Sequence, residues 1–292
     1  MKQYILKFAA LRWLALILIT AILMLSSAPV IAQAQGAHYG VAPIYPDNQR
    51  PDRGGHFNLN MNPGERQRID VLIENFGTDT IHLDVTVNDA RTNDHGVMEY
   101  APAKMPVPGH APHVSEIVAS HQSRLSIAPG DKEFARFEIL MPDDAFEGVI
   151  VGGLHFVQAV QANAETGGTG IVNRIAYAVP IVLRIHDEVA DPAFELIAAR
   201  GHSHEPAKIS VTLKNLEARI SRLRNVTAYL YSDDDEPIEV LSHDQVLLAP
   251  HAAPNLSFAR TSDQPIPKGE YRLVINFECD EWPYLLESPI RI

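Results

Sequence analysis

Strict alternation of apolar and polar side chains is the feature that most constrains how this chain folds. From Ile81 to Asn88 the odd-numbered residues are all aliphatic and the even-numbered residues are all polar. Successive side chains of a β-strand point to opposite faces, so this pattern predicts a strand with one face on a core and the other in water. The same period recurs at Ile69–Ile73, Phe137–Met141, Ile175–Leu183, Ile209–Leu213 and Tyr271–Phe277. No window of twelve residues after the N-terminal region has a convincing helical period, and the sequence therefore predicts an all-β fold.

The first 34 residues have the order of a secretory signal peptide. Three basic residues precede an apolar run from Trp13 to Leu25, and the small-residue segment Ala32-Gln33-Ala34 follows. The run is shorter than the roughly 20 residues that a membrane-spanning helix needs. We therefore expect cleavage after Ala34 and export of the remaining chain, with a retained N-terminal anchor as the alternative.

Charge and cysteine content exclude several classes of protein. The chain has 36 acidic residues against 24 Lys and Arg, which gives a formal net charge of −12. A surface this acidic repels phosphate backbones and anionic lipids, so we expect no nucleic-acid binding. The single cysteine, Cys279, cannot form a disulfide within the chain, and stability must come from burial instead.

An internal echo predicts two similar modules. The segment Ile69–Asn75 resembles Ile209–Asn215, and Pro-Gly pairs precede two of the alternating strands. Two immunoglobulin-like β-sandwiches in tandem are the economical explanation. Charge and proline end the alternation at Asp187–Pro192, where we place the boundary. The predicted organisation is a signal peptide at 1–34, a first sandwich at 35–190 and a second sandwich at 191–292.

Several short motifs carry a resemblance to a known family. In the first module they begin with Val41-Ala42-Pro43-Ile44-Tyr45-Pro46 and His56–Gly64, and they continue with Thr92–Val97, Ile127-Ala128-Pro129-Gly130, Met141-Pro142 and Phe146–Gly153. In the second module they are Val211–Asn215, Leu248-Ala249-Pro250, Pro267–Tyr271 and Trp282. The first module resembles the peptidoglycan-binding domain of the WxL-interacting protein family of Gram-positive bacteria, and the second is similar to its host-binding domain.

The resemblance implies a non-catalytic adaptor at the cell surface or in the cell wall. Its implied partners are peptidoglycan, WxL-domain surface proteins and host extracellular-matrix proteins, and it implies a role in adhesion. The family usually continues into a C-terminal transmembrane helix, whereas this sequence stops at Ile292. Membrane anchoring is therefore open at this stage.

Five residues are the candidates for contact with peptidoglycan: Tyr45, Asn48, Asn93, Asp94 and Tyr100. Sugars are commonly recognised by an amphipathic aromatic ring with amides beside it, and Tyr45 and Tyr100 fall outside clean alternation. Asn93 and Asp94 belong to a polar tip that ends in Gly96. Such a tip either bonds its own backbone in a hairpin or reaches a ligand.

No metal, cofactor or catalytic residue is predicted. The pairs His110/His113 and His202/His204 lack a third ligand nearby, and the acidic run Asp233–Glu236 lacks the alternate oxygens and the glycine of a calcium loop. No nucleophile motif is present, and the carboxylates near Glu147 lie in a charged loop.

Two other functions remain open besides the adaptor. An exported assembly chaperone made of two sandwiches binds its client by β-strand addition, and such a protein has no affinity for wall sugar. A wall hydrolase releases muropeptides and loses this activity when Glu147 is changed to Gln.

Overall fold

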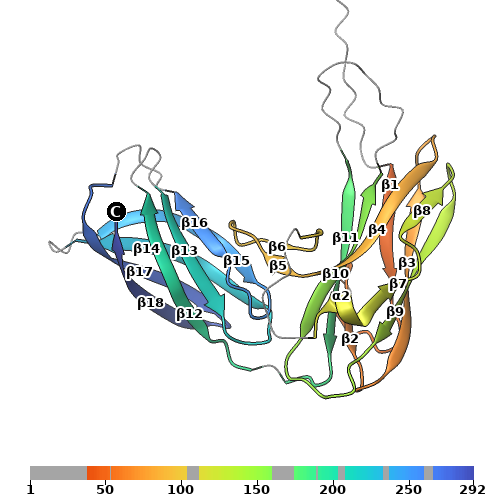
Figure 1. The fold of residues 1–292 in the computed structure, drawn as a ribbon, viewed down its shortest axis with the longest axis horizontal. Helices are drawn as coiled ribbons and strands as arrows, with labels where there is room; N and C mark the ends of the chain where they lie inside the picture. The colour runs from red at the N-terminus through yellow and green to blue at the C-terminus, as the bar shows by residue number, and fades with distance from the viewer. Residues whose placement is uncertain are drawn as a thin grey trace, which may run out of the picture. The chain divides into compact units, whose positions relative to one another are not determined.

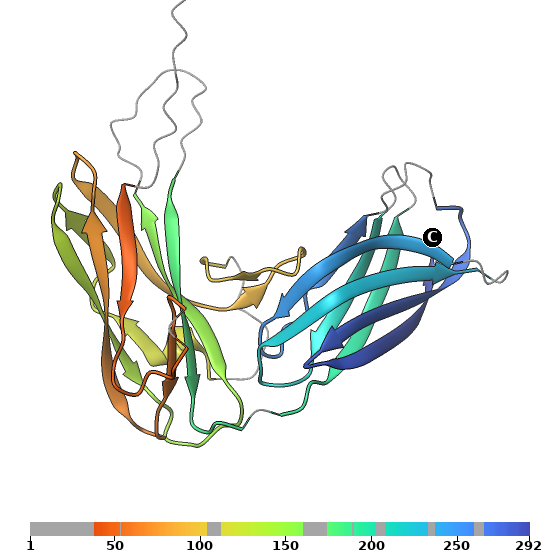
Figure 2. The ribbon, with the colours of Figure 1, turned by 180° about the vertical axis from the view of Figure 1, so that it is seen from behind.

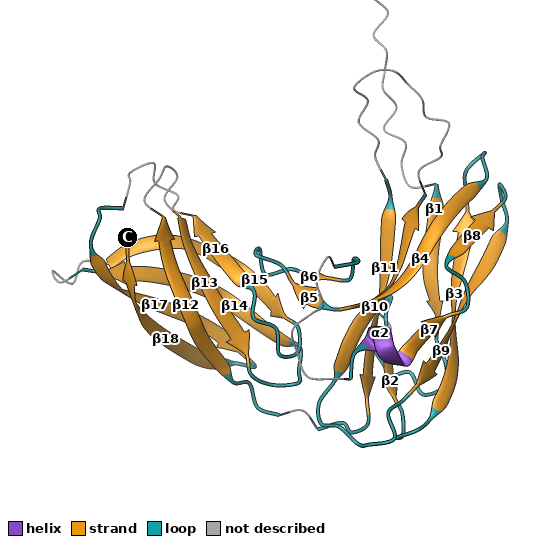
Figure 3. Cartoon of the chain, viewed as in Figure 1, coloured by secondary structure: helices purple, strands orange, loops and turns teal. Residues whose placement is uncertain are grey.

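The computed structural model describes residues 38–52, 54–103, 112–159, 174–188, 190–202, 208–232, 237–259 and 266–292. The predicted signal peptide, the acidic run Asp233–Glu236, His110 and His204 lie outside the described residues. The described chain is nearly all β, and its one helix is the single turn α2 (Val114–Ile117) (Figure 3). The all-β prediction is therefore confirmed.

The first β-sandwich is built from two facing sheets (Figures 1 and 2). One sheet has the order β1-β3-β9-β7 and the other has the order β2-β11-β10-β4-β8. A separate two-stranded sheet, β5-β6, forms a hairpin. The strands of this part of the chain are β1 (Tyr39–Ile44), β2 (Phe57–Asn60), β3 (Arg66–Asn75), β4 (Ile81–Asp89), β5 (Arg91–Thr92), β6 (Met98–Glu99), β7 (Val118–Ser120), β8 (Arg124–Ile127), β9 (Lys132–Leu140), β10 (Ile150–Gln158) and β11 (Ala176–Arg184).

The core of the first sandwich follows the alternation in the sequence. In β4, Ile81, Leu83 and Val85 are buried, while the polar residues between them stay partly exposed. Phe137 and Phe156 are fully buried and meet edge to face, with ring centroids 6.2 Å apart. Burying an aromatic or aliphatic side chain stabilises a fold by about 1.5–3 kcal/mol, and this core holds the two sheets together.

The second β-sandwich has its own pair of sheets, β12-β13-β16 and β15-β14-β17-β18. All pairs within these sheets are antiparallel. The strands are β12 (Phe194–His202), β13 (Lys208–Asn215), β14 (Ser221–Tyr231), β15 (Pro237–Leu248), β16 (Asn255–Ala259), β17 (Glu270–Cys279) and β18 (Trp282–Arg291).

An aromatic cluster closes one edge of the second core. Phe194 of β12 meets Phe277 and Tyr284 edge to face, each with a centroid distance of 5.1 Å. Phe277 and Tyr284 stack with their centroids 5.3 Å apart. Because these three rings come from both sheets, they join the sheets where β12 and β18 are edge strands.

The similarity between Ile69–Asn75 and Ile209–Asn215 in the sequence corresponds to the same hydrogen-bonding arrangement in both sandwiches. Asn75 ends β3 and Asn215 ends β13, and both are completely buried. Each side-chain amide donates to a carbonyl four residues later and to a second carbonyl far along the chain, those of Asp79 and Ile127 for Asn75 and those of Arg219 and Ala249 for Asn215. The two asparagines therefore hold the same turn in both sandwiches.

Proline marks the limits of strand pairing in the first sandwich. Pro180 lies in β11 opposite Gly153 of β10, and the parallel pairing of β11 with β2 starts one residue later, at Ile181. Proline has no backbone N–H to donate, so it is tolerated where a strand has a neighbour on one side only.

Within the described ranges, no helix has the length and apolar character to cross a membrane.

Candidate functional sites

A polar network lies on the outer side of β2 in the first sandwich. Phe57 and Leu59 point into the core and are fully buried, so Asn58 and Asn60 point the other way. The segment before β2 runs back along it, because the Arg50 N–H donates to the carbonyl of Asn58 at 2.9 Å. We call the side chains of Gln49, Arg50, Asp52, His56, Asn58, Asn60, Arg184 and Asp187 the Asn58 network.

Hydrogen bonds join the members of the Asn58 network. The amide nitrogen of Asn58 donates to Asp52 at 2.7 Å, and the ring of His56 lies 3.1 Å from the same carboxylate. Asn60 donates to Asp187 at 3.0 Å, and Arg50 forms an ion pair with Asp187. The network thus connects β2 with the segment that precedes it and with the segment that follows β11.

The network favours the ionised form of both aspartates. Partial burial opposes the ionisation of Asp52, but hydrogen bonds from Asn58 and His56 outweigh it and lower the pKa of this carboxyl. The hydrogen bond from Asn60 and the charge of Arg50 lower the pKa of Asp187. Burial and the nearby charge of Arg50 lower the pKa of Arg184, which Asp187 and Asp52 partly offset. The positive charges of two arginines and the negative charges of two aspartates therefore cancel at neutral pH.

Three polar atoms of the network are buried without a hydrogen-bond partner among the described residues. They are the side-chain oxygens of Asn58 and Asn60 and the Nε of Arg184. The parallel register of β2 and β11 sets Arg184 opposite Asn60. Buried polar groups in folded proteins nearly always have partners, so a cluster of three such atoms calls for an explanation.

Two of the sequence candidates, Tyr45 and Asn48, lie beside this network. The hydroxyl of Tyr45 accepts a hydrogen bond from the Gly55 N–H at 3.0 Å, and its ring meets Phe57 edge to face. Asn48 donates to the carbonyl of Asn60 at 2.9 Å and exchanges hydrogen bonds with Gln67 at 2.8 Å in both directions. Both side chains are half-buried and help to hold the segment along β2.

Asn93 and Asp94 lie elsewhere, at the tip of the β5–β6 hairpin. The side-chain oxygen of Asn93 accepts from the backbone of His95 and Val97, each at 3.0 Å, and its nitrogen donates to Glu99 at 2.7 Å. The carbonyl of Asp94 accepts from the Ser257 N–H at 3.1 Å, while its side chain is exposed. The amide of Asn93 is therefore engaged within its own hairpin.

The hairpin contacts strands of the second core. The Thr92 hydroxyl donates to the carbonyl of Leu247 at 2.8 Å and accepts from the Ala249 N–H at 2.9 Å. Gly96 has φ +73°, and a Cβ atom there would lie 2.7 Å from Val246, so both conformation and space favour glycine. The glycine that ends this tip thus serves packing.

Tyr100 packs against the sheet that contains β10. A Cβ atom placed on Gly153 would lie only 2.5 Å from the Cβ of Tyr100, so Gly153 leaves room for this side chain. The Tyr100 hydroxyl is 3.1 Å from the sulfur of Met98. Burial raises the pKa of its hydroxyl. Tyr100 belongs to a small apolar cluster with Val151 and Ala249, which leaves less of its ring available to a ligand than an exposed platform would have.

The five sequence candidates therefore fall into two groups. Tyr45 and Asn48 adjoin the Asn58 network, whereas Asn93, Asp94 and Tyr100 lie at or near the β5–β6 hairpin. Sequence reasoning did not select Asn58, Asn60, Arg184 or Asp187. Asparagine is depleted in strands, so its occurrence at two alternate positions next to Phe57 and Leu59 was the available signal for Asn58 and Asn60.

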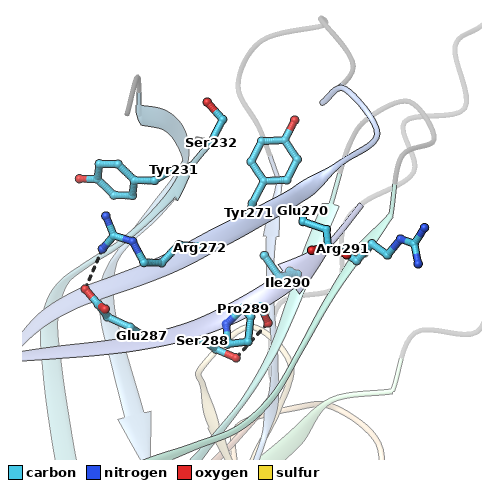
Figure 4. A pocket seen from close by; sticks show the side chains of 10 residues that line it. All are labelled: Tyr231, Ser232, Glu270, Tyr271, Arg272, Glu287, Ser288, Pro289, Ile290 and Arg291. Carbon is cyan, nitrogen blue, oxygen red and sulfur yellow. Dashed lines mark hydrogen bonds and ion pairs between the residues drawn. The ribbon is translucent and has the colours of Figure 1, made fainter. Parts of the chain in front are cut away.

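The second sandwich has a candidate surface of a different kind. A shallow pocket of about 780 Å³ lies where β17 and β18 pair beside the end of β14. In Figure 4 the guanidinium of Arg272 lies between the ring of Tyr231 and the carboxylate of Glu287. Arg272 is 4.7 Å from the ring centroid and 2.9 Å from the carboxylate oxygen.

The strand register extends this surface across the outer face of the sheet. Tyr231 lies opposite Arg272, which lies opposite Pro289, and Tyr229 lies opposite Val274 in the next outward row. Val274 is only 4% exposed although it points away from the core, so its neighbours cover it. Tyrosine and arginine held in this way are the side chains that most often carry binding energy at protein interfaces.

The geometry of both surfaces suits binding. In the described part of the chain, no three His, Cys, Asp or Glu side chains are grouped to hold a metal ion. The described chain is an all-β protein of two sandwiches, each with its own core and its own candidate surface.

Comparison with known protein families shows the family of the chain. Residues 39–158 match the peptidoglycan-binding domain of the WxL-interacting protein, and residues 166–287 match its host-binding domain. The chain belongs to the WxL-interacting protein family. Both matched domains are described as binding domains, and the resemblance found in the sequence is confirmed. No curated protein matches the chain.

Several solved structures are similar to the chain at low sequence identity. The chain is similar to a structure of the CsuC–CsuE chaperone–adhesin pre-assembly complex of Acinetobacter baumannii, with 12% identity, 87% and 98% coverage of the two chains and a TM-score of 0.39. It is also similar to the CupB2 chaperone of Pseudomonas aeruginosa, with 9% identity, 78% and 95% coverage and a TM-score of 0.33. Scores this low support no conclusion about function.

The matched ranges and the two cores divide the chain differently. The host-binding match begins at residue 166, before β11. In the structure, β11 pairs with β10 and β2, and its residues Val179, Ile181 and Leu183 belong to the first core. Packing thus assigns β11 to the first sandwich.

Proposed function

We propose that the protein is a non-catalytic adaptor at the bacterial cell surface that holds peptidoglycan with one module and protein partners with the other. The family of both modules supports this proposal. The observation that carries it is the Asn58 network, which contains buried polar atoms without hydrogen-bond partners among the described residues. This network lies on the module that matches a peptidoglycan-binding domain. Tyr45 and Asn48 form the rim of the proposed site.

The second module supplies the protein-binding part of the proposal. Its outer sheet face combines Tyr231, Arg272 and Pro289 in one row, with Arg272 held by Glu287. Partner proteins of the WxL type and host extracellular-matrix proteins are the proposed occupants, because the matched family is named for the first and its second domain is described as host-binding. A preorganised arginine loses little conformational freedom on binding, which favours affinity.

Export and domain limits are part of the same proposal. A cleaved signal peptide at residues 1–34 would deliver the chain to the wall. A boundary between residues 190 and 191 would keep β11 with the first core and would let β12 begin the second. Limited proteolysis followed by mass spectrometry of the fragments tests this boundary.

Sedimentation with purified wall sacculi tests the peptidoglycan part. We expect the mature protein to pellet with sacculi, and we expect Asn58→Ala to weaken this at least about 10-fold, which corresponds to about 1.4 kcal/mol. The variants of Asn93, Asp94 and Tyr100 to Ala test the second group of sequence candidates in the same assay. A protein that forms stoichiometric complexes with an exported client but does not pellet with sacculi would be a chaperone instead.

Capture of a purified WxL-domain protein tests the partner part. We expect Tyr231→Ala and Arg272→Ala to weaken capture, because each removes one side of the stacked pair. Ser126→Ala on the first sandwich is the matched control and should leave capture unchanged. Equal capture by all four proteins would remove this surface from the proposal.

A further inference from the structure

We infer that the Asn58 network binds the hydroxyl groups of the neutral glycan strand, rather than the anionic groups of the wall. This inference rests on the proposed function and specifies the ligand of its first site. It begins with the three unpartnered atoms, which are the oxygens of Asn58 and Asn60 and the Nε of Arg184. A buried polar group is favoured when it has a hydrogen-bond partner, so a ligand that supplies partners to these three atoms is favoured at this place.

The donor and acceptor character of these atoms excludes ligands that only accept hydrogen bonds. An amide oxygen accepts hydrogen bonds only, and the Nε–H of arginine donates only. A complementary ligand must therefore donate to Asn58 and Asn60 and accept from Arg184. Hydroxyl groups do both, whereas a carboxylate or a phosphodiester at neutral pH accepts only and would leave both amide oxygens unsatisfied.

The charges around the three atoms lead to the same ligand class. Asp52 donates nothing and accepts from Asn58, and Asp187 accepts from Asn60 and Arg50. Both carboxylates are ionised at neutral pH, as aspartates ordinarily are. Arg50 and Arg184 balance them, and the site has no excess positive charge to attract an anion.

The Arg50–Asp187 pair is the group whose movement would open the site. Its side chains are 32% and 67% exposed, respectively, while Asn58 is only 7% exposed. An ion pair this exposed contributes little to stability, so separation of Arg50 from Asp187 costs little. A sugar hydroxyl can then donate to the amide oxygens and accept from the Nε of Arg184.

Competition with a defined oligosaccharide tests the inference. The probe is the N-acetylglucosamine hexamer, which has the hydroxyl and acetamido groups of the glycan strand but no carboxylate. We expect it to displace the protein from sacculi, and we expect equal binding at 0.05 M and 0.5 M NaCl because no ion pair with the ligand is lost. Free stem peptide should not compete.

Two variants locate the site. We expect Arg184→Lys, which keeps the charge but lacks the Nε donor, to bind the hexamer at least 10-fold more weakly. Asn60→Ala should do the same. Asn88→Ala is the control, since this amide lies on the outer side of the same sheet and already donates to Thr86 and Tyr100. Thermal unfolding of each variant shows whether it is folded.

The outcomes separate this inference from the proposed function. Loss of sacculus binding above about 0.3 M NaCl, or displacement by stem peptide and not by the hexamer, would overturn the inference and leave a wall-binding protein. Full hexamer affinity in folded Arg184→Lys and Asn60→Ala would also overturn it. If the unmodified protein does not pellet with sacculi at all, the proposed function fails instead.

Discussion

The buried asparagines of the two sandwiches differ in how completely their hydrogen bonds are made. Asn75 and Asn215 occupy the same place at the end of β3 and β13, and each amide has two carbonyl acceptors and a backbone donor. Asn58 is nearly as buried, yet its side-chain oxygen has no partner among the described residues. Similar burial with a different number of hydrogen bonds therefore distinguishes the two asparagines that hold turns from the one that we propose as a ligand contact.

The comparison also separates the two modules. The described part of the second sandwich has one buried side-chain atom without a partner, the Nε of Arg219, whose other nitrogens bind Ala190 and Asp280. Its outer sheet face instead shows aromatic and charged groups that are already paired. Buried atoms without hydrogen-bond partners are concentrated in the first module, and paired aromatic and charged groups lie on the second. This difference is consistent with the proposed sugar ligand of the first module and the proposed protein ligand of the second.

The largest expected effect tests the equivalence of Asn75 and Asn215. Each change to Ala removes two hydrogen bonds to backbone carbonyls, one of them buried, and one from a backbone N–H. At about 1 kcal/mol for each bond, we expect each variant to lower the free energy of unfolding by about 3 kcal/mol. Denaturant unfolding measures this, with exposed Asn62→Ala and Asn255→Ala as controls. A cost below about 1 kcal/mol at either position would show that the turn is held in another way.

Alkaline unfolding tests the contribution of Tyr39 to the first sandwich. Burial, with a smaller contribution from Tyr177, raises the pKa of Tyr39 far above its usual value of about 10, and its hydroxyl donates to the carbonyl of Ile175. Because the unfolded state loses this proton first, stability is fully present below pH 10. It then falls by up to about 1.4 kcal/mol per pH unit. Tyr39→Phe should flatten this decrease, and an unchanged slope would contradict the assignment.

The contrast between structural and binding asparagines predicts a small stability effect at Asn58. Asn58→Ala loses one hydrogen bond to the partly exposed Asp52 but also removes an unsatisfied oxygen, so we expect a cost below about 1 kcal/mol. The same denaturant titration that measures Asn75→Ala measures this variant. A loss as large as that of Asn75→Ala would mean that Asn58 is a structural residue.

Acid unfolding gives the smallest expected effect. The pKa of Asp52 is lowered in the folded state, so its contribution is present above about pH 4 and is lost as the pH falls through the folded pKa. We expect Asp52→Asn to reduce the loss of stability between pH 5 and pH 3 slightly, because the carboxylate is largely exposed. Identical acid profiles of the two proteins would show that the network does not favour the ionised form.

Much of the fold could be predicted from local pattern. Ile81, Leu83 and Val85 face the core because period two and burial on one face leave no other arrangement, and the echo between Ile69–Asn75 and Ile209–Asn215 indicated a repeated module. Which strands pair with one another could not be predicted from the sequence. The parallel contact of β2 with β11 joins residues more than 120 positions apart, and nothing local in either strand specifies it.

The candidate site was predictable only at its rim. Tyr45 and Asn48 adjoin the network because their segment runs along β2, while Arg184 and Asp187 reach it through the long-range pairing of β11. Asn93 and Asp94 were selected as a loop tip. Whether a tip is open or engaged depends on contacts such as that of Thr92 with Leu247, which no short motif encodes.

The most direct test of the account is an NMR titration of the side-chain amides with the N-acetylglucosamine hexamer. The account predicts that the amide signals of Asn58 and Asn60 shift on addition of the hexamer while those of Asn75 and Asn215 stay in place. Unchanged signals of Asn58 and Asn60 at hexamer concentrations that displace the protein from sacculi would contradict it.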